Sequence, residues 1–130
     1  MEKFNNIIST IKFNESGLVP AIAQQFDSGE VLMMAWMNKD AVIQTLTTGQ
    51  VYYFSRSRCR LWRKGESSGQ DQLLKTLLID CDGDTILIKV DQKGVACHTG
   101  RRGCFFNEVT GDKIEINQDV IVSPYELYKY

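Results

Sequence analysis

Two cysteines and the only histidine of the chain fall within the eight residues from Cys97 to Cys104, beside two arginines and two glycines. The arginines favour the thiolate form of cysteine, which is the form that binds metal. Cys81 would supply a third thiolate, and three protein ligands plus water is the arrangement typical of catalytic zinc. These residues favour a zinc site that retains an open position for chemistry.

Other roles for the same residues stay open at this point. Cys59 lies between two arginines and is either a fourth ligand or an exposed or half-buried residue without a role in metal binding. Scattered free cysteines are also common as small buried apolar residues. A nucleophilic pair of Cys97 or Cys104 with His98 is a further alternative, although adjacent side chains rarely face each other.

A second group of possible metal ligands is the acidic segment Asp80-Cys81-Asp82-Gly83-Asp84. In an extended backbone its three aspartates point to one side and Cys81 points to the other. A bound cation would relieve the repulsion between the carboxylates, and oxygen ligands suit Mg²⁺ or Ca²⁺. The alternative is a polar turn between two strands, where Asp and Gly are common.

The segment from Arg56 to Lys64 carries five positive charges in nine residues and no acid. As a strand it would align Arg56, Arg58 and Arg60, which could grip phosphate, while Trp62 could stack on a base. The Gly65–Gly69 loop lacks the spacing of a P-loop but can offer backbone N–H groups and hydroxyls to phosphate. Unless the segment is only a solvated charged face, it indicates a nucleotide near the metal.

The chain has 130 residues, which fits one domain over residues 1–130. Its net charge of −1 argues against a general nucleic-acid or polybasic membrane binder. The longest apolar run, from Val31 to Met37, is far shorter than a membrane span. We therefore expect a cytoplasmic protein with reduced cysteines and with neither nucleic acid nor membrane as a partner.

Short strands dominate the pattern of expected elements. Residues 39–48 form the clearest helix, because Asn38 can cap its start and Gly49 can end it. The first dozen and the last seven residues could be short helices. This order is not a regular βαβ alternation, so we expect an α+β, β-rich fold of mixed short strands with a few helices. The expected strands are 18–26, 30–37, 51–55, 73–79 and 85–90.

Six segments taken together resemble the phosphoribosyl-AMP cyclohydrolase family, in the order in which that family has them. The resemblance runs from about Gly17 to Phe106, and the flanking segments do not share it. The segments are Gly17-Leu18-Val19-Pro20-Ala21-Ile22-Ala23-Gln24, Met34-Ala35-Trp36-Met37-Asn38, Ser55-Arg56-Ser57-Arg58, Leu61-Trp62-Arg63-Lys64-Gly65-Glu66-Ser67-Ser68-Gly69, Asp80-Cys81-Asp82-Gly83-Asp84 and Ala96-Cys97-His98-Thr99-Gly100-Arg101-Arg102.

The resemblance implies the third step of histidine biosynthesis, in which zinc-activated water opens the adenine ring of N1-(5-phosphoribosyl)-AMP between N1 and C6. It implies a compact fold paired as an intertwined homodimer, with zinc on Cys81, Cys97 and Cys104 from both chains. It also implies Mg²⁺ on Asp80, Asp82 and Asp84. Cys59 stands at a position that varies in the family, so we expect it to lie outside the site. A chain of this length leaves the preceding pyrophosphohydrolase step, which some relatives carry as a fused domain, to another protein.

For this reaction His98 is the expected catalytic base, because its reference pKa of about 6.5 suits proton transfer near pH 7. The alternative is that His98 only orients the substrate or a zinc ligand. The expected phosphate contacts are Arg56, Arg58, Lys64, Arg101 and Arg102, and the pocket is expected to be lined by Trp62, Glu66, Ser67 and Ser68.

Two other classes of function compete with this reading. One is a module that binds single-stranded nucleic acid and holds structural zinc, which steep salt-dependent binding to oligonucleotides would reveal. The other is a different hydrolase of nucleosides or nucleotides. An absorbance assay of ring opening, with and without a chelator, separates all three.

Overall fold

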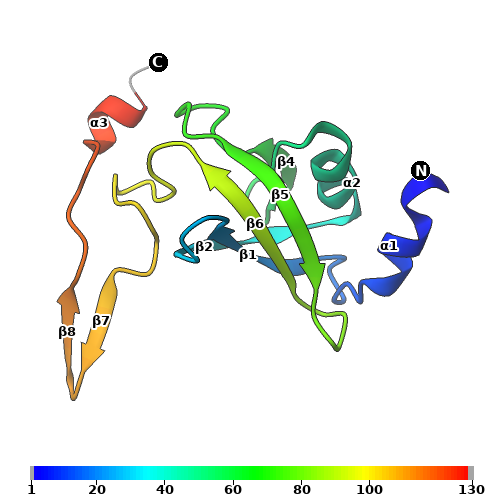
Figure 1. Cartoon of the computed structure of the whole chain (residues 1–130), viewed down its shortest axis with the longest axis horizontal. Coiled ribbons are helices and arrows are strands. Elements are labelled where there is room, and N and C mark those ends of the chain that lie inside the picture. The colour runs from blue at the N-terminus through cyan, green and yellow to red at the C-terminus, as the bar shows by residue number, and fades with distance from the viewer. Residues whose placement is uncertain (1, 129–130) are drawn as a thin grey trace.

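A four-stranded sheet in the order β2-β1-β6-β5 forms the centre of the computed structural model, which describes residues 2–128 (Figure 1). β1 pairs antiparallel with β2 and parallel with β6, and β6 pairs antiparallel with β5. The sheet is therefore mixed, with the parallel pair at its centre. The strands are β1 Val19–Gln25, β2 Val31–Met37, β5 Gln72–Ile79 and β6 Ile86–Gln92.

One face of the two central strands builds the hydrophobic core. Successive side chains of a strand point to opposite faces, and in β1 and β6 every second residue is buried. Val19, Ala21 and Ala23 of β1 are fully buried beside Ile86 and Ile88 of β6. The small alanines leave room for the branched side chains opposite them, so this face is closely filled.

The helix α2 (Lys39–Thr48) belongs to the same core through Ala41 and Val42, which are fully buried. Its first turn is capped by Asn38, whose side-chain oxygen accepts a hydrogen bond of 2.8 Å from the backbone N–H of Ala41. It ends at Gly49, which has φ = +76° and so adopts the left-handed conformation that glycine tolerates. The sequence predicted these bounds, and the structure confirms them.

A hairpin of β3 (Tyr52–Ser55) and β4 (Arg60–Arg63) follows α2 and carries most of the basic segment. Residues 56–59 form the turn of this hairpin, so the prediction of one strand that aligns Arg56, Arg58 and Arg60 is wrong. The reason is the antiparallel pairing of Ser55 with Arg60, which reverses the chain between them. Cys59 lies in this turn with φ = +50°.

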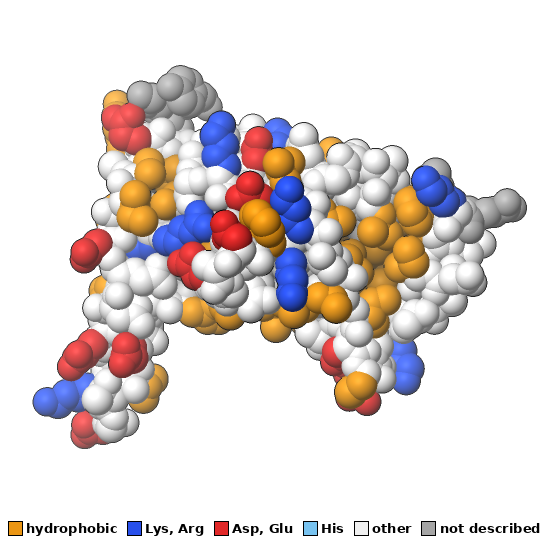
Figure 2. All heavy atoms as spheres, viewed as in Figure 1, with side chains coloured by type: hydrophobic (Ala, Val, Ile, Leu, Met, Phe, Trp, Pro, Cys, Tyr) orange, Lys and Arg blue, Asp and Glu red, His pale blue; other side chains and the backbone are white. Residues whose placement is uncertain are grey.

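A second hairpin projects from the body of the molecule and was not predicted from the sequence. It consists of β7 (Asn107–Thr110) and β8 (Lys113–Ile116), whose residues are all exposed. We call it the arm. In the views of Figures 1 and 2 the arm extends away from the sheet, and acidic side chains gather on it. It also exposes Val109, Ile114 and Ile116 to between 59% and 71%.

The remaining helices lie near the two ends of the chain. The N-terminal segment forms η1 (Glu2–Phe4) and α1 (Asn5–Thr10), and the C-terminal segment forms α3 (Pro124–Leu127). The helices predicted for the first dozen and last seven residues are therefore present but short, and the part of the prediction at 1, 129 and 130 lies outside the described residues. None of the helices within 2–128 is long and apolar enough to cross a membrane.

The α+β, β-rich fold class is confirmed, and each of the five expected strands is present to within two residues at either end. A second local expectation, an extended backbone from Asp80 to Asp84, was also wrong, and the alternative of a polar turn between two strands is confirmed. The segment is the turn of the β5–β6 hairpin. Its aspartates therefore come together by chain reversal and not by strand alternation.

Candidate active site

A cavity of about 400 Å³ lies where the loop after β6 meets β2, β4 and the end of α3. We call it the central cavity. It has the size of a small-molecule site, and it brings together many residues that the sequence marked as functional. Those that line it are Trp62, Lys64, Glu66, Ser67, Ser68, His98 and Cys104.

The loop that carries Cys97, His98 and Cys104 is held by backbone hydrogen bonds on both sides. The N–H of Ala96 donates to the carbonyl oxygen of Arg102 at 2.9 Å, which closes the loop on itself. The N–H of Cys104 donates to the carbonyl oxygen of Leu32 in β2 at 2.7 Å. These bonds bring the two cysteines, seven positions apart in the sequence, to neighbouring positions in the site.

The Cys97 and Cys104 thiols lie close enough to influence each other. Cys97 is 4% exposed and Cys104 is half-buried. Burial raises the pKa of Cys104 to about 12, and the charge of Cys97 and a hydrogen bond with it add to the shift. A divalent cation bound between these two neighbouring sulfurs would stabilise their thiolate forms, so the pair is suited to hold a metal.

Lys64 lies beside these two thiols, and only 8% of it is exposed. Its Nζ donates a hydrogen bond of 2.8 Å to the carbonyl oxygen of Ala96, next to Cys97 in the chain. Burial lowers the pKa of Lys64, and the charges of Cys104 and Cys97 oppose that shift. The structure therefore places Lys64 with the thiols, whereas the arginines with which it was grouped lie on the β3–β4 hairpin or in the loop.

His98 is exposed and lines the central cavity. Its neighbour Cys97 has another partner, because the Cys97 Sγ lies 3.0 Å from the hydroxyl of Thr99. His98 therefore faces the cavity, whereas the side chain of its neighbour Cys97 is buried in the protein. This arrangement leaves the imidazole available to a molecule in the cavity.

Cys81 lies in the turn that joins β5 to β6, whereas Cys97 and Cys104 follow the other end of β6. Figure 1 shows the long β5–β6 hairpin that separates this turn from the loop after β6. β6 alone has seven residues, which at about 3.3 Å per residue separates its two ends by roughly 20 Å. Among residues 2–128, the only group of three side chains placed to hold one metal ion is the aspartate cluster. One chain by itself therefore does not assemble the three cysteines.

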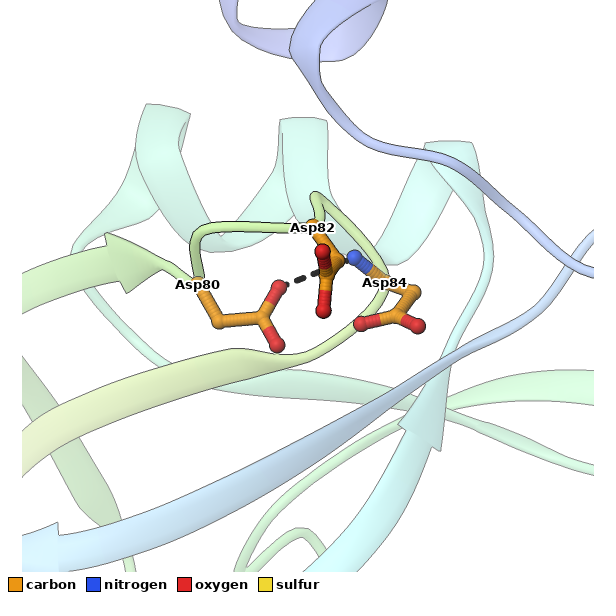
Figure 3. Close-up of side chains that lie close together, drawn as sticks. All are labelled: Asp80, Asp82 and Asp84. Atoms are coloured by element: carbon orange, nitrogen blue, oxygen red, sulfur yellow. Dashed lines mark hydrogen bonds between the residues drawn. The ribbon is translucent and has the colours of Figure 1, made fainter.

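The carboxylates of Asp80, Asp82 and Asp84 converge on the outside of the β5–β6 turn (Figure 3). Each offers an oxygen within 4.8 Å of the others. An Asp80 oxygen accepts hydrogen bonds from the backbone N–H groups of Asp84, at 3.0 Å, and Thr85, at 3.3 Å. The side-chain hydrogen bond with Asp80, followed by the charge of Asp80, raises the pKa of Asp84. An exposed set of oxygen donors of this kind fits Mg²⁺ or Ca²⁺.

This turn is packed against the N-terminal segment at Gly83. The N–H of Lys12 donates to the carbonyl oxygen of Gly83 at 2.7 Å. Gly83 has φ = +76°, and a Cβ there would lie 2.6 Å from the carbonyl oxygen of Thr10. Only glycine satisfies both conditions, so Gly83 fixes the turn that presents the three aspartates.

The β3–β4 hairpin forms two further cavities that adjoin the central one, and Trp62 lines all three. The first, of about 250 Å³, contains Arg58 and Arg60 with Ser55, Glu66 and Ser67. The second, of about 680 Å³, is wide and contains Arg56, whose guanidinium lies 4.9 Å from the ring centre of Trp36. Trp62 is itself held in place by Tyr53, with ring centres 5.2 Å apart.

Arg101 and Arg102 lie outside the linings of these three cavities and contact neighbouring protein groups. Arg101 donates to the carbonyl oxygen of Gln118 at 3.0 Å and lies over the ring of Phe106. The guanidinium of Arg102 contacts four acceptors in the segments around the loop. These are Glu30 Oε1 at 3.1 Å, Gln25 Oε1 at 3.0 Å, and the carbonyl oxygens of Gln92, at 3.1 Å, and Gly94.

Comparison with known proteins now assigns the chain. The family model of phosphoribosyl-AMP cyclohydrolase matches residues 33–106. A protein of Paramagnetospirillum magneticum named phosphoribosyl-AMP cyclohydrolase is 66% identical over 95% of this chain and 93% of its own length. Relatives of the same name from Alcanivorax borkumensis and Halorhodospira halophila are 62% and 58% identical, over 85% and 86% of their lengths and over 93% and 94% of this chain.

The chain belongs to the phosphoribosyl-AMP cyclohydrolase family. It is therefore an enzyme, a hydrolase of histidine biosynthesis. The residues matched by the family model include the thiol pair, the aspartate cluster and the β3–β4 hairpin, but neither the arm nor α3.

Sequence reasoning missed the C-terminal contribution to the central cavity of this family member. Tyr128 lines the cavity, and burial, followed by the charge of Cys97, raises its pKa. The C-terminal segment is brought there by Gly100, whose carbonyl oxygen accepts hydrogen bonds from the N–H groups of Ile121 and Val122. No periodicity or motif in the sequence signals this contact.

Three buried glutamines behind the loop were also missed. Gln72 accepts a hydrogen bond of 2.7 Å from the hydroxyl of Tyr53 and donates one of 2.8 Å to Gln92. Gln25 accepts from the backbone N–H of Gln92 at 2.9 Å and also from Arg102. The signal was the presence of glutamine in otherwise apolar strands, since a buried polar side chain requires partners.

Replacing Arg102 by glutamine is expected to lower the free energy of unfolding by about 2 kcal/mol, because hydrogen bonds to a charged group are lost and buried acceptors are left unpaired. Urea denaturation monitored by circular dichroism would measure the loss. Arg58→Gln is the matched control, and it should change the free energy by no more than about 0.5 kcal/mol because Arg58 is exposed. Equal small effects of both substitutions would contradict the structural role of Arg102.

Proposed function

We propose that this protein hydrolyses the N1–C6 bond of N1-(5-phosphoribosyl)-AMP and opens the adenine ring to the formimino aminoimidazole carboxamide ribonucleotide. The family assignment supports the reaction class, and the relatives carry this substrate in their names. The observation that carries the proposal is the central cavity of about 400 Å³, which is lined by Trp62, His98 and the thiol of Cys104, the neighbour of Cys97. Such a role accords with the cytoplasmic location expected from the sequence.

Cys97 and Cys104 of one chain would hold zinc together with Cys81 of a second copy. Zinc there would supply the Lewis acidity that makes water nucleophilic near neutral pH. The proposal of a homodimer is supported by the separation of Cys81 from the other two thiols within one chain. It is also supported by the arm, because an exposed hairpin with Val109, Ile114 and Ile116 on its surface is suited to burial against another chain.

The other groups of the central cavity have separate tasks in this proposal. Trp62 offers a flat face on which the adenine ring can stack. Substitution at N1 withdraws electrons from C6, so water attacks C6, and the bond from C6 to N1 then breaks. His98 takes the proton from water and returns one to the departing nitrogen. Lys64, beside the thiols, balances part of the negative charge that three thiolates bring to the site.

The aspartate cluster would hold Mg²⁺, which is suited to the phosphates of the substrate. Cys81 lies in the same turn as Asp80, Asp82 and Asp84. If Cys81 reaches the thiol pair of a partner chain, that turn accompanies it. The two metal sites would then be close together at the interface of the dimer, although they are far apart within one chain.

The direct test is ring opening of N1-(5-phosphoribosyl)-AMP, followed by the change in ultraviolet absorbance. The purified protein should turn the substrate over, and removal of metal with a chelator should stop turnover until zinc is restored. Turnover that persists in protein shown to be free of metal would reject the zinc mechanism. No turnover of this substrate in zinc-loaded protein would reject the proposed reaction.

Replacing His98 by alanine is expected to lower kcat by roughly a hundredfold or more if the imidazole transfers the proton. Steady-state kinetics with zinc-loaded protein would measure the change. His98 is exposed, so the substitution should leave the fold and the zinc content unchanged. An effect confined to KM would contradict the role as base and make His98 a binding residue.

A further inference from the structure

The two phosphates of the proposed substrate need two separate anion sites. The substrate carries one ribose 5-phosphate on N1 and another on N9, and these nitrogens lie at opposite ends of the purine. The two arms therefore diverge from the ring. If the ring occupies the central cavity, the surrounding surface must offer a cationic group in two different directions.

The β3–β4 hairpin provides cationic groups in two such places. The Arg58 cavity, lined by Ser55, Arg58, Arg60, Trp62, Glu66 and Ser67, meets the central cavity at Glu66 and Ser67. The Arg56 cavity, lined among others by Trp36, Arg56 and Ser57, meets the central cavity at Met34 and Ala35. Trp62 lines all three cavities.

Each of these cavities combines a guanidinium with hydroxyl groups, a combination suited to phosphate. In the Arg58 cavity, Glu66 Oε2 forms an ion pair with the guanidinium of Arg60 at 3.7 Å. Glu66 Oε1 accepts a hydrogen bond of 2.6 Å from the backbone N–H of Arg63. Arg60 therefore offsets the charge of Glu66, and Arg58 supplies the excess positive charge. In the Arg56 cavity, the guanidinium is supported by the face of Trp36, which orients it without neutralising it.

The other three cations that were expected to bind phosphate contact protein groups instead. Lys64 donates to the carbonyl oxygen of Ala96 beside the thiols, and Arg102 contacts four protein acceptors. Arg101 contacts Gln118 and Phe106. The hairpin arginines thus remain as the cations that line cavities next to the central one.

We propose, on the basis of the proposed function, that the Arg56 and Arg58 cavities each bind one of the two substrate phosphates, with Trp62 separating the two arms of the substrate. The turn between β3 and β4 carries both arginines, so it would select substrates that have two phosphates. A mononucleotide such as AMP would engage only one of the two cavities.

The test couples each arginine to each phosphate. The kcat/KM of wild type, Arg56→Gln and Arg58→Gln would be measured with the full substrate and with two analogues, each lacking one phosphate. With the full substrate both variants should lose about 10- to 100-fold, as expected for a charged hydrogen bond. The loss for Arg56→Gln should vanish with one analogue, and the loss for Arg58→Gln should vanish with the other.

Controls separate a binding role from a structural one. Arg56→Lys and Arg58→Lys should regain part of the activity with the full substrate, because the charge is kept. Lys39→Gln, at an exposed cation on α2, should leave all kinetic constants unchanged. Equal unfolding curves for all variants would show that the fold is intact.

The proposal is overturned if both losses vanish with the same analogue, or if either loss persists with both analogues. The second outcome would show that the arginine in question does not act through a phosphate of the substrate. Absence of turnover by the wild-type protein would instead reject the proposed function itself, so the two failures are distinguishable.

Discussion

Replacing Cys97 by serine is expected to remove zinc and to lower ring-opening activity by roughly a thousandfold or more. A Lewis acid contributes several kcal/mol to lowering the barrier, and two remaining thiolates bind zinc far less tightly than three. Metal content by atomic emission and turnover by absorbance would be measured on the same preparation. Both quantities should fall together.

Cys97 is buried, so the substitution also carries a risk to folding, and unfolding curves must accompany the activity. Cys104→Ser, at a half-buried position, provides a second variant with the same expected outcome. Cys59→Ser is the matched control, because Cys59 is exposed in the β3–β4 turn and should have no effect on zinc. Full activity in a metal-free Cys97→Ser protein would reject the zinc mechanism.

Mixing two inactive variants is expected to restore activity if the zinc site is shared between chains. Cys81→Ser and Cys97→Ser remove ligands from opposite ends of the β5–β6 hairpin. In a mixed dimer, one site contains both defects and the other is intact. Random pairing makes half of the dimers mixed, so coexpression should restore about one quarter of the wild-type activity.

The arrangement of the ligands supplies an internal control for this experiment. Cys97 and Cys104 lie together in one chain, so a mixture of Cys97→Ser and Cys104→Ser should remain inactive. Every site in that mixture carries at least one defect. Recovery in this control, or no recovery when the Cys81 and Cys97 variants are mixed, would contradict the shared site. Sedimentation analysis would show whether the variants still form dimers.

Local chemistry made much of the fold predictable. The helix α2 was predicted with its bounds because its capping residue Asn38 and its terminal Gly49 lie within a dozen residues of each other. The central strands were predictable because their apolar runs end at turn-forming residues. The arm was missed although Ile114 and Ile116 alternate with polar residues, because each of its strands has only four residues, and so short a run is a weak signal.

The candidate site was predictable in its membership more than in its arrangement. The residue types predicted a zinc site, a carboxylate site and a basic segment, because thiolates, carboxylates and guanidinium groups each prefer particular metals or anions. Which members meet was not predictable. Lys64 and Arg102 were grouped with the phosphate-binding residues by charge, but burial beside Ala96 and hydrogen bonds to Gln25 and Glu30 give them other surroundings.

The sequence by itself determined the chemistry available to this protein: four thiols, one imidazole, three clustered carboxylates and a basic segment, most of them in the order typical of its family. Only the tertiary structure decided their grouping. It joined Cys97 and Cys104 in one loop and placed Cys81 at the far end of β6. The reason is that the residue type alone fixes what a side chain can bind. Which side chains lie close together depends instead on strand pairing between segments far apart in the chain.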